Sequence, residues 1–229
     1  MQCLQLTRGE PPSTIDAIFS NNSWEKIIAA CQSGNVPDSW AVGDSKTMAI
    51  NGRNYQIDII GKNHDTYTAG GTAPLTFQMH DCYGTKYAMN SLDTNSGGWT
   101  SCAMRSTHLP AILALMPSEV QAGIREVNKL TLAGNQSSTI NTTADKLFLL
   151  SEIEIFGSTT YSKSGEGTQY DYYKVGNSKV KNFSGSATHW WERSPFRNDS
   201  TNFCRVNRYG SADLSNESSS YGVAFAFCF

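Results

Sequence analysis

The chain has 229 residues, of which 39% are hydrophobic, 11% aromatic and 17% charged, and its formal net charge is −2. This length suits one main domain with a core of its own, and the composition is that of a turn-rich folded protein that leans towards β structure. The sequence contains no block of five or more Lys or Arg. It therefore lacks the basic footprint that binding to nucleic acid or to an anionic membrane requires, and we expect neither partner.

We also expect no membrane insertion and no secretory signal. The most apolar stretch, residues 109–116, stops at Pro117 and is far shorter than the roughly 20 residues that cross a bilayer. The first 23 residues carry Arg8 and Glu10 and have no apolar core of the kind a signal peptide needs.

The chain divides into two predicted parts, a short N-terminal segment and a main domain. Residues 1–22 are weakly patterned and are interpreted as an N-terminal arm or docking segment, which offers a contact for an assembly partner. Residues 23–229 form the predicted main domain. It opens with a helix, because Ser23 is a good N-cap, Gly34 is a good stop, and apolar residues recur at helical spacing between them.

Strands and helices alternate in the next part. Residues 46–50 and 53–60 flank Asn51-Gly52, the strongest short-range signal for a β-hairpin. Leu75–Met79 is a predicted strand, and residues 101–116 and 118–127 have helical spacing. Residues 147–150 and 153–156 are predicted strands, the first a continuous apolar run and the second alternating. A long structured loop over residues 157–185 follows, with four tyrosines as packing groups.

The last part of the chain carries the candidate site. The predicted strands are residues 189–192, 203–206 and 222–227, and Trp190 and Trp191 are interpreted as structural. Between these strands lies a mixture of planar anchors and adaptable hydrogen-bonding groups, as in antibody contact loops. The candidate ligand-binding residues are Phe196, Arg197, Asn198, Asp199, Asn202, Arg205, Asn207, Arg208, Tyr209, Asp213, Asn216 and Tyr221. Replacing Arg197, Arg205 and Tyr209 by alanine is expected to leave stability nearly unchanged, because exposed substitutions cost little.

Residues 145–151, 189–195, 203–206 and 222–227 together resemble C-type-lectin-fold domains of phage and bacterial proteins that serve as targets of diversity-generating retroelements. This fold is shared with formylglycine-generating enzymes. The resemblance implies an α+β, C-type-lectin-like fold with a small antiparallel C-terminal sheet, two or three helices and long loops. It implies a variable face at about residues 192–221 and no cofactor.

The function implied by the resemblance is non-enzymatic capture of a host-surface protein or glycan. The implied location is a phage tail, as part of the virion, or a bacterial cell surface. Proteins of this kind are often homotrimers.

A genetic expectation follows from the resemblance. Retroelement mutagenesis acts on adenines, chiefly in AAC or AAT codons, which cannot yield Lys, Gln, Glu, Met or Trp while the third base stays a pyrimidine. These five types make up 38 of the 229 residues, yet none occurs in the 24 residues from Arg193 to Asn216. That gap favours diversification of this segment.

Two other classes of function stay open. A formylglycine-generating type of enzyme would need a catalytic cysteine pair, and no segment of this chain matches one; a structural virion or surface module is the second alternative. The six cysteines include no C-x-x-C pair, so buried free thiols are favoured, with a Cys204–Cys228 disulfide left open.

No metal site is predicted. Asn198-Asp199 follows Arg197, where calcium-dependent lectins have Trp, and Asp58, His64 and Asp65 follow a hairpin, where such residues usually form turns.

Overall fold

The structure is a computed structural model that describes residues 14–229. Within these residues, helical segments alternate with four small sheets, in which all strand pairs are antiparallel. The helical segments are η1 (Phe19–Asn21), α1 (Trp24–Ser33), α2 (Gly98–Ser101), the π-helical turn η2 (Met104–His108), α3 (Leu109–Leu113), α4 (Ser118–Gly123), α5 (Glu152–Phe156) and α6 (Asp171–Lys174). The predicted mixture of α and β structure is confirmed, although there are more helical segments than the two or three expected.

The strands in the described part of the chain form sheets of four, three, two and two strands. The orders are β1-β2-β3-β11, β10-β9-β8, β4-β5 and β6-β7. The bounds are β1 (Ser45–Ile50), β2 (Arg53–Lys62), β3 (Leu75–Met79), β4 (Val127–Leu132), β5 (Ile140–Asp145), β6 (Lys181–Phe183), β7 (Ser186–Thr188), β8 (Trp190–Pro195), β9 (Asn202–Val206), β10 (Ala212–Asn216) and β11 (Ala226–Cys228).

The two best-marked predictions for the first part of the chain are confirmed. Helix α1 begins after Ser23, whose side chain accepts a hydrogen bond from the Lys26 amide, and ends at Gly34 in the left-handed region. Strands β1 and β2 meet at Asn51 and Gly52, with φ of 49° and 74°, the backbone that a tight type I′ hairpin turn requires.

The predicted arm over residues 1–22 needs correction where the structure describes it. Residues 1–13 lie outside the described residues. Phe19 is only 2% exposed and packs against Trp40 and Phe77, so the segment around it belongs to the core of the domain. The Trp40 indole also donates to the Asp16 carbonyl, at 3.1 Å. An aromatic side chain in an otherwise polar segment can be buried even where no periodic pattern predicts it.

The two strands predicted at 147–150 and 153–156 are wrong. Residues 147–150 are buried but form only an isolated bridge, from Phe148 to Ala226. Residues 152–156 form α5, which begins with a capping box: the Ser151 side chain accepts from the Glu154 amide, and the Glu154 carboxylate accepts from the Ser151 amide. Apolar and acidic residues alternate in this segment only over residues 152–156. The capping box at Ser151 favours a helix there in spite of that alternation.

Several boundaries also differ from those predicted. Helix α4 stops at Gly123, and β4 starts at Val127 inside the predicted helix. Only residues 226–228 of the predicted strand 222–227 enter the ladder, as β11. The loop over 157–185 contains α6 and β6, and two of its four tyrosines, Tyr170 and Tyr173, are buried as expected of packing groups.

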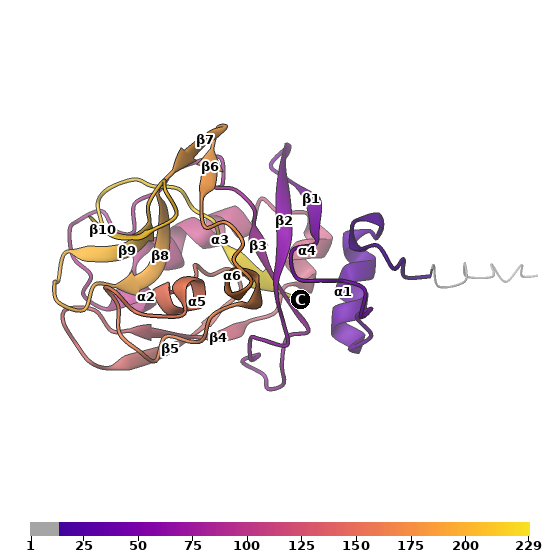
Figure 1. Cartoon of the computed structure of the whole chain (residues 1–229), viewed down its shortest axis with the longest axis horizontal. Coiled ribbons are helices and arrows are strands. Elements are labelled where there is room, and N and C mark those ends of the chain that lie inside the picture. Colours follow the sequence, from indigo (N-terminus) through magenta and orange to yellow (C-terminus); the bar gives the residue numbers. More distant parts are fainter. Residues whose placement is uncertain (1–13) are drawn as a thin grey trace, which may run out of the picture.

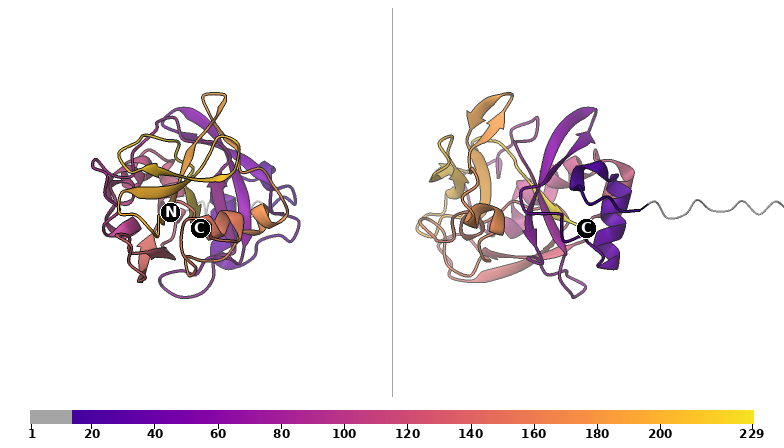
Figure 2. Two further views of the ribbon diagram at one scale, coloured as in Figure 1. Left: turned by 60° about the vertical axis from the view of Figure 1, so that its left-hand side comes forward. Right: turned by 45° about the vertical axis from the view of Figure 1, so that its right-hand side comes forward.

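The β8–β9–β10 sheet lies at the opposite end of the molecule from α1 (Figure 1). The four-stranded sheet lies between these two ends, and the β6–β7 hairpin projects from the body in each view (Figures 1 and 2). Among residues 14–229, the helices all lack the length and apolar character needed to cross a membrane.

Candidate binding face

The candidate face is built on the three-stranded sheet. β9 lies in the middle, paired with β10 from Asn202↔Asn216 to Val206↔Ala212. Its pairing with β8 shifts register between Trp191 and Pro195, where the ladder is irregular. The intervening residues of β8 are buried, as are the paired ones.

A buried layer supports the sheet. Trp190, Trp191, Phe203 and Val206 are all fully buried, as expected for structural residues. Each indole N–H also has an acceptor: Trp190 donates to the Lys179 carbonyl and Trp191 to the Tyr87 carbonyl, both at 2.9 Å. The two tryptophans therefore belong to the scaffold and are not available to a ligand.

Arg205 lies in the central strand of this sheet, on the same side as its cross-strand neighbours Trp191 and Asp213. Its guanidinium donates twice to one Asp213 carboxylate oxygen, at 2.8 and 3.2 Å, and lies 4.4 Å from the centre of the Tyr221 ring. Tyr221 in turn covers Trp191 edge-on at 5.1 Å. Arg205, Asp213 and Tyr221 thus form one connected cluster on the sheet, each with contacts inside the protein.

The β9–β10 turn forms an exposed tip at one end of the sheet. The Asn207 side chain accepts from the amides of Tyr209 and Ser211, at 2.9 and 3.1 Å, and so fixes the turn from within. Arg208 and Tyr209 are displayed on it, joined by a hydrogen bond of 2.6 Å from the guanidinium to the phenol oxygen. Tyr209 is 72% exposed, an unusually large aromatic surface for a tip.

The β8–β9 loop forms the other end. Arg197 donates from its guanidinium to the Ser162 carbonyl at 2.8 Å, and the Phe196 ring meets Tyr161 edge-on at 6.0 Å. The Asp199 carboxylate accepts from the Thr201 amide and hydroxyl and stabilises the turn. This end of the face is therefore built from two loops that hold each other.

The predicted residues lie on β9 and β10, in the β8–β9 loop and at the tip; β9 alone, between the loop and the tip, is about 13 Å long at the usual rise of a strand. None of the twelve is buried. Their side chains differ in role: Asn198, Arg208, Tyr209 and Asn216 are exposed, whereas Asn207 and Asp199 hold turns. The expectation that replacing Arg205 leaves stability unchanged needs correction, because its side chain is only 13% exposed and neutralises Asp213.

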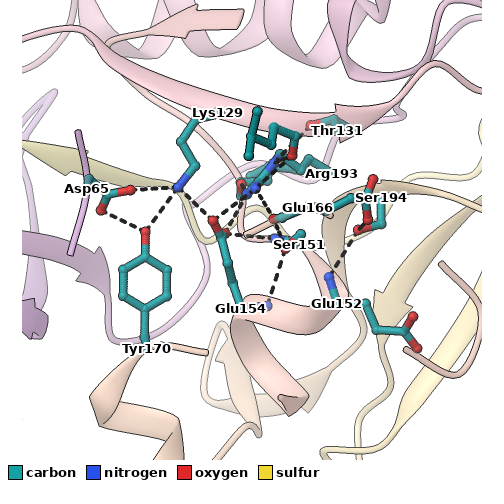
Figure 3. A network of polar contacts seen from close by, with 12 residues as sticks. Asp65, Lys129, Thr131, Ser151, Glu152, Glu154, Glu166, Tyr170, Arg193 and Ser194 are labelled. Atoms are coloured by element: carbon teal, nitrogen blue, oxygen red, sulfur yellow. Dashed lines mark hydrogen bonds and ion pairs between the residues drawn. The ribbon is translucent and has the colours of Figure 1, made fainter. Parts of the chain in front are cut away.

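A buried polar network, which the sequence did not predict, includes Arg193 of β8 and Lys129 of β4 (Figure 3). The Lys129 ammonium contacts the carboxylates of Asp65 and Glu154, each at 2.7 Å, and Arg193 pairs with the other oxygen of Glu154. All four side chains are at most 3% exposed. Burial opposes ionisation of Asp65, but the Lys129 ammonium and the Thr76 hydroxyl lower its pKa to about 2.

Arg193 joins this network to the candidate face, because it belongs to β8 and precedes the β8–β9 loop. Next to it, the Ser194 hydroxyl donates to the Glu166 carboxylate at 2.6 Å, and the Leu132 amide donates to the other oxygen at 2.7 Å. Burial raises the pKa of Glu166 to about 7. The end of β8 is therefore fixed by charged and polar contacts on its inner side.

Glu152 links the end of β8 to the loop of residues 160–162 at the face. Its amide donates to the Ser194 hydroxyl at 3.0 Å, and its carboxylate accepts from the amides of Thr160, Tyr161 and Ser162. The same short segment supplies the carbonyl that binds the Arg197 guanidinium. The loop beside Arg197 is thus anchored to a fully buried carboxylate.

The cysteines and the residues considered for a metal have other roles. The five cysteines that the structure describes are free and buried, so Cys204 and Cys228 form no disulfide, and burial raises the pKa of the Cys204 thiol well above its usual value. The Asp58 carboxylate lies within hydrogen-bonding distance of His80 Nδ1, and Asp65 belongs to the buried network.

The fold and the face define a mixed α/β domain with a solvent-accessible polar and aromatic surface on a small antiparallel sheet. A family model described as a domain of unknown function (DUF6273) matches residues 76–229, and the chain belongs to this family. The match includes β8, β9, β10 and most of the buried network, but not Asp65. No curated protein and no solved structure matches the chain.

Proposed function

We propose that this chain is a non-enzymatic ligand-binding protein whose face along β9 engages a host-surface protein or glycan. The observation that carries the proposal is the tip of the β9–β10 turn, where Tyr209 is 72% exposed beside Arg208. Tyrosine and arginine supply large contact area and forked donors, and they are the residue types that dominate binding surfaces. A tip of this kind contributes little to folding.

The separation between scaffold and surface supports the same proposal. The inner side of the sheet is buried and held by the Arg193 and Glu152 contacts, so the outer residues at the tip can change without loss of the fold. Recognition loops work best when a rigid scaffold holds them in position. An enzyme of the cysteine type is disfavoured for the described residues, because burial raises the pKa of their thiols.

The proposal extends to diversification, to a C-type-lectin-like arrangement and to a phage tail or bacterial surface as location. Residues 193–216, which lack Lys, Gln, Glu, Met and Trp, include the β8–β9 loop, β9, the tip and β10. Buried positions in this segment, such as Phe203 and Val206, must stay constant if the scaffold is to persist. Diversity should therefore concentrate at Asn198, Arg208, Tyr209 and Asn216, the exposed members of the predicted set.

One test is genetic and needs only DNA sequence. If the face is diversified, the DNA after the gene contains a near-copy of the codons for residues 193–216 beside a reverse-transcriptase gene. Differences between the two copies fall at adenines and at codons of exposed residues. A complete genome without such a copy would remove diversification from the proposal and leave a fixed binding face.

A second test addresses binding itself. Fluorescently labelled protein is applied to a panel of bacterial cells and to a glycan array, alongside the double variant Arg208→Ala/Tyr209→Ala and the control Gln32→Ala, an exposed change in α1 at the opposite end of the molecule from the face. We expect saturable binding that the double variant loses and the control retains. Equal binding by all three proteins, with the fold intact by circular dichroism, would place recognition elsewhere on the molecule.

A further inference from the structure

A second site lies away from the candidate face. A polar cavity of about 160 Å³ lies between β2 and the β6–β7 hairpin, and none of its lining residues belongs to the predicted binding set. Arg53 and Asn54 of β2, His80 and Asp81 after β3, and Asn182 of β6 contribute to its wall. These residues come from three separate parts of the sequence.

The β6–β7 hairpin is fixed against the four-stranded sheet, which gives the cavity a defined shape. Ser184 and Gly185 have φ of 51° and 83°, so the hairpin closes in a tight turn. The Asn182 amide donates to the Asp81 carboxylate at 2.6 Å. The side chain of Lys181, only 4% exposed, donates to the His80 carbonyl at 2.9 Å and fixes β6 behind the wall.

His80 is held in one orientation by a buried acid. Its Nδ1 lies 2.7 Å from a carboxylate oxygen of Asp58, whose side chain is 4% exposed, while the His80 side chain is 46% exposed. The Asp58 hydrogen bond raises the pKa of His80, and partial burial opposes this effect. Because Nδ1 faces Asp58, Nε2 is the ring nitrogen left to donate to a ligand.

Two side chains with free donors, those of Arg53 and Asn54, line the cavity together with the carboxylate of Asp81. Within residues 14–229 the side chains of Arg53 and Asn54 make no hydrogen bond, and the Arg53 guanidinium lies 5.4 Å from the centre of the Tyr55 ring. The carboxylate oxygens of Asp81 are both directed to Asn182, at 2.6 and 3.4 Å. An acceptor-rich, negatively charged ligand fits such a wall, because guanidinium and imidazolium groups bind oxyanions through charge-assisted hydrogen bonds.

We propose that this cavity binds a compact oxyanion, of the sulfate or phosphate-ester class, between the Arg53 guanidinium and the His80 imidazolium. Asp58 acts as a positioning residue that keeps His80 oriented and protonated. This site is independent of the face along β9, so either proposal can fail alone.

The test uses sulfate, which keeps its charge over the relevant pH range. The full chain is titrated with sodium sulfate at about pH 5.5, against sodium chloride at equal ionic strength, and amide signals are followed by nuclear magnetic resonance. We expect saturable shifts at Asn54, Asn182 and Gly185, with a dissociation constant of about 1 mM. The Arg53→Gln variant should bind at least about tenfold more weakly. The control Lys163→Gln removes the same charge elsewhere and should bind like the wild type.

The pH dependence provides an independent readout. The groups that face His80 are Asp58 of β2, Asp81, Lys181 of β6 and, through Asp58, Tyr172 of α6. With a raised folded-state pKa, His80 stays cationic at and somewhat above its ordinary pKa, so sulfate affinity falls only as the pH rises through the raised value.

Two variants complete the test of His80. His80→Gln should abolish this pH dependence, and Asp58→Asn should move the fall in affinity to lower pH. Shifts that do not saturate, shifts that chloride reproduces, or equal affinities in Arg53→Gln and wild type would overturn the proposal.

Discussion

Arg193 is the residue on which the scaffold depends most directly. Its side chain is fully buried, and its guanidinium pairs with the Glu154 carboxylate. It donates further hydrogen bonds to the Thr131 hydroxyl and to the carbonyls of Leu130, Leu149 and Glu166. Replacing Arg193 by Met keeps an unbranched side chain of moderate length but removes the charge and all of these donors.

The expected cost follows from the groups left behind. Removing one partner of a buried ion pair costs about 3 to 5 kcal/mol, because the remaining charge stays buried without compensation. Glu154 retains Lys129 at 2.7 Å, which softens the loss, but the carbonyls around Arg193 lose their donors. For a chain of this size the loss corresponds to a fall in melting temperature of about 6 to 20 °C.

Urea unfolding followed by circular dichroism measures this difference, with Arg208→Met as the matched control. The same substitution at the exposed tip should change the free energy of unfolding by no more than about 0.5 kcal/mol. If Arg193→Met costs under about 1 kcal/mol, or if both variants cost the same, the buried network does not support the sheet, and the distinction between scaffold and surface is wrong.

Four smaller predictions concern buried groups. Because burial raises the folded-state pKa of Glu166 from 4.5 to about 7, the folded chain holds a proton that the unfolded chain has released between these values. Stability should therefore fall by roughly 3 kcal/mol as pH rises through this window, and a Glu166→Gln variant should lack this part of the slope in urea titrations. Ser151→Ala removes one half of the capping box of α5 and should cost about 1 kcal/mol, whereas an unchanged urea midpoint would contradict the role of the cap. Glu192 is fully buried, and neither of its carboxylate oxygens has a partner within residues 14–229, so Glu192→Met should stabilise the protein by about 1 to 2 kcal/mol; a loss of stability would indicate a missing partner. A Cys3→Ser variant should react slowly with a thiol reagent when native and at five thiols when unfolded, and rapid native labelling would disprove burial of the described cysteines.

Local signals in the sequence predicted local structure well. Ser23 and Gly34 delimit α1, and Asn51-Gly52 sets the hairpin, because the side chain or backbone freedom of these residues acts within a few positions. The same kind of signal was present at Ser151, whose spacing to Glu154 is that of a capping box. The prediction gave more weight to the alternation of apolar residues after Ser151 than to this cap. It therefore placed a strand where α5 lies.

The buried network could not be predicted in this way. The ion pair between Lys129 and Asp65 joins residues 64 positions apart, and the hydrogen bonds between Arg193 and Glu154 span 39 positions. No periodicity links such residues, and a charged side chain in a strand is ordinarily expected to face solvent. Trp190 and Trp191 were interpreted as structural, but nothing in the local sequence indicates that Arg193, two residues after Trp191, is fully buried.

The structure also divides the predicted binding set by physical role. Asn207 and Asp199 have the composition of a contact surface, yet their side chains hold the turns that display their neighbours. The Arg205 guanidinium already contacts Asp213 and the Tyr221 ring. Arg208 and Tyr209 are therefore the side chains most available to a partner. A binding face of this kind keeps its shape through residues that resemble ligand contacts in composition. Changes at Asn207 should therefore alter the orientation of Tyr209 even where Asn207 does not contact the ligand.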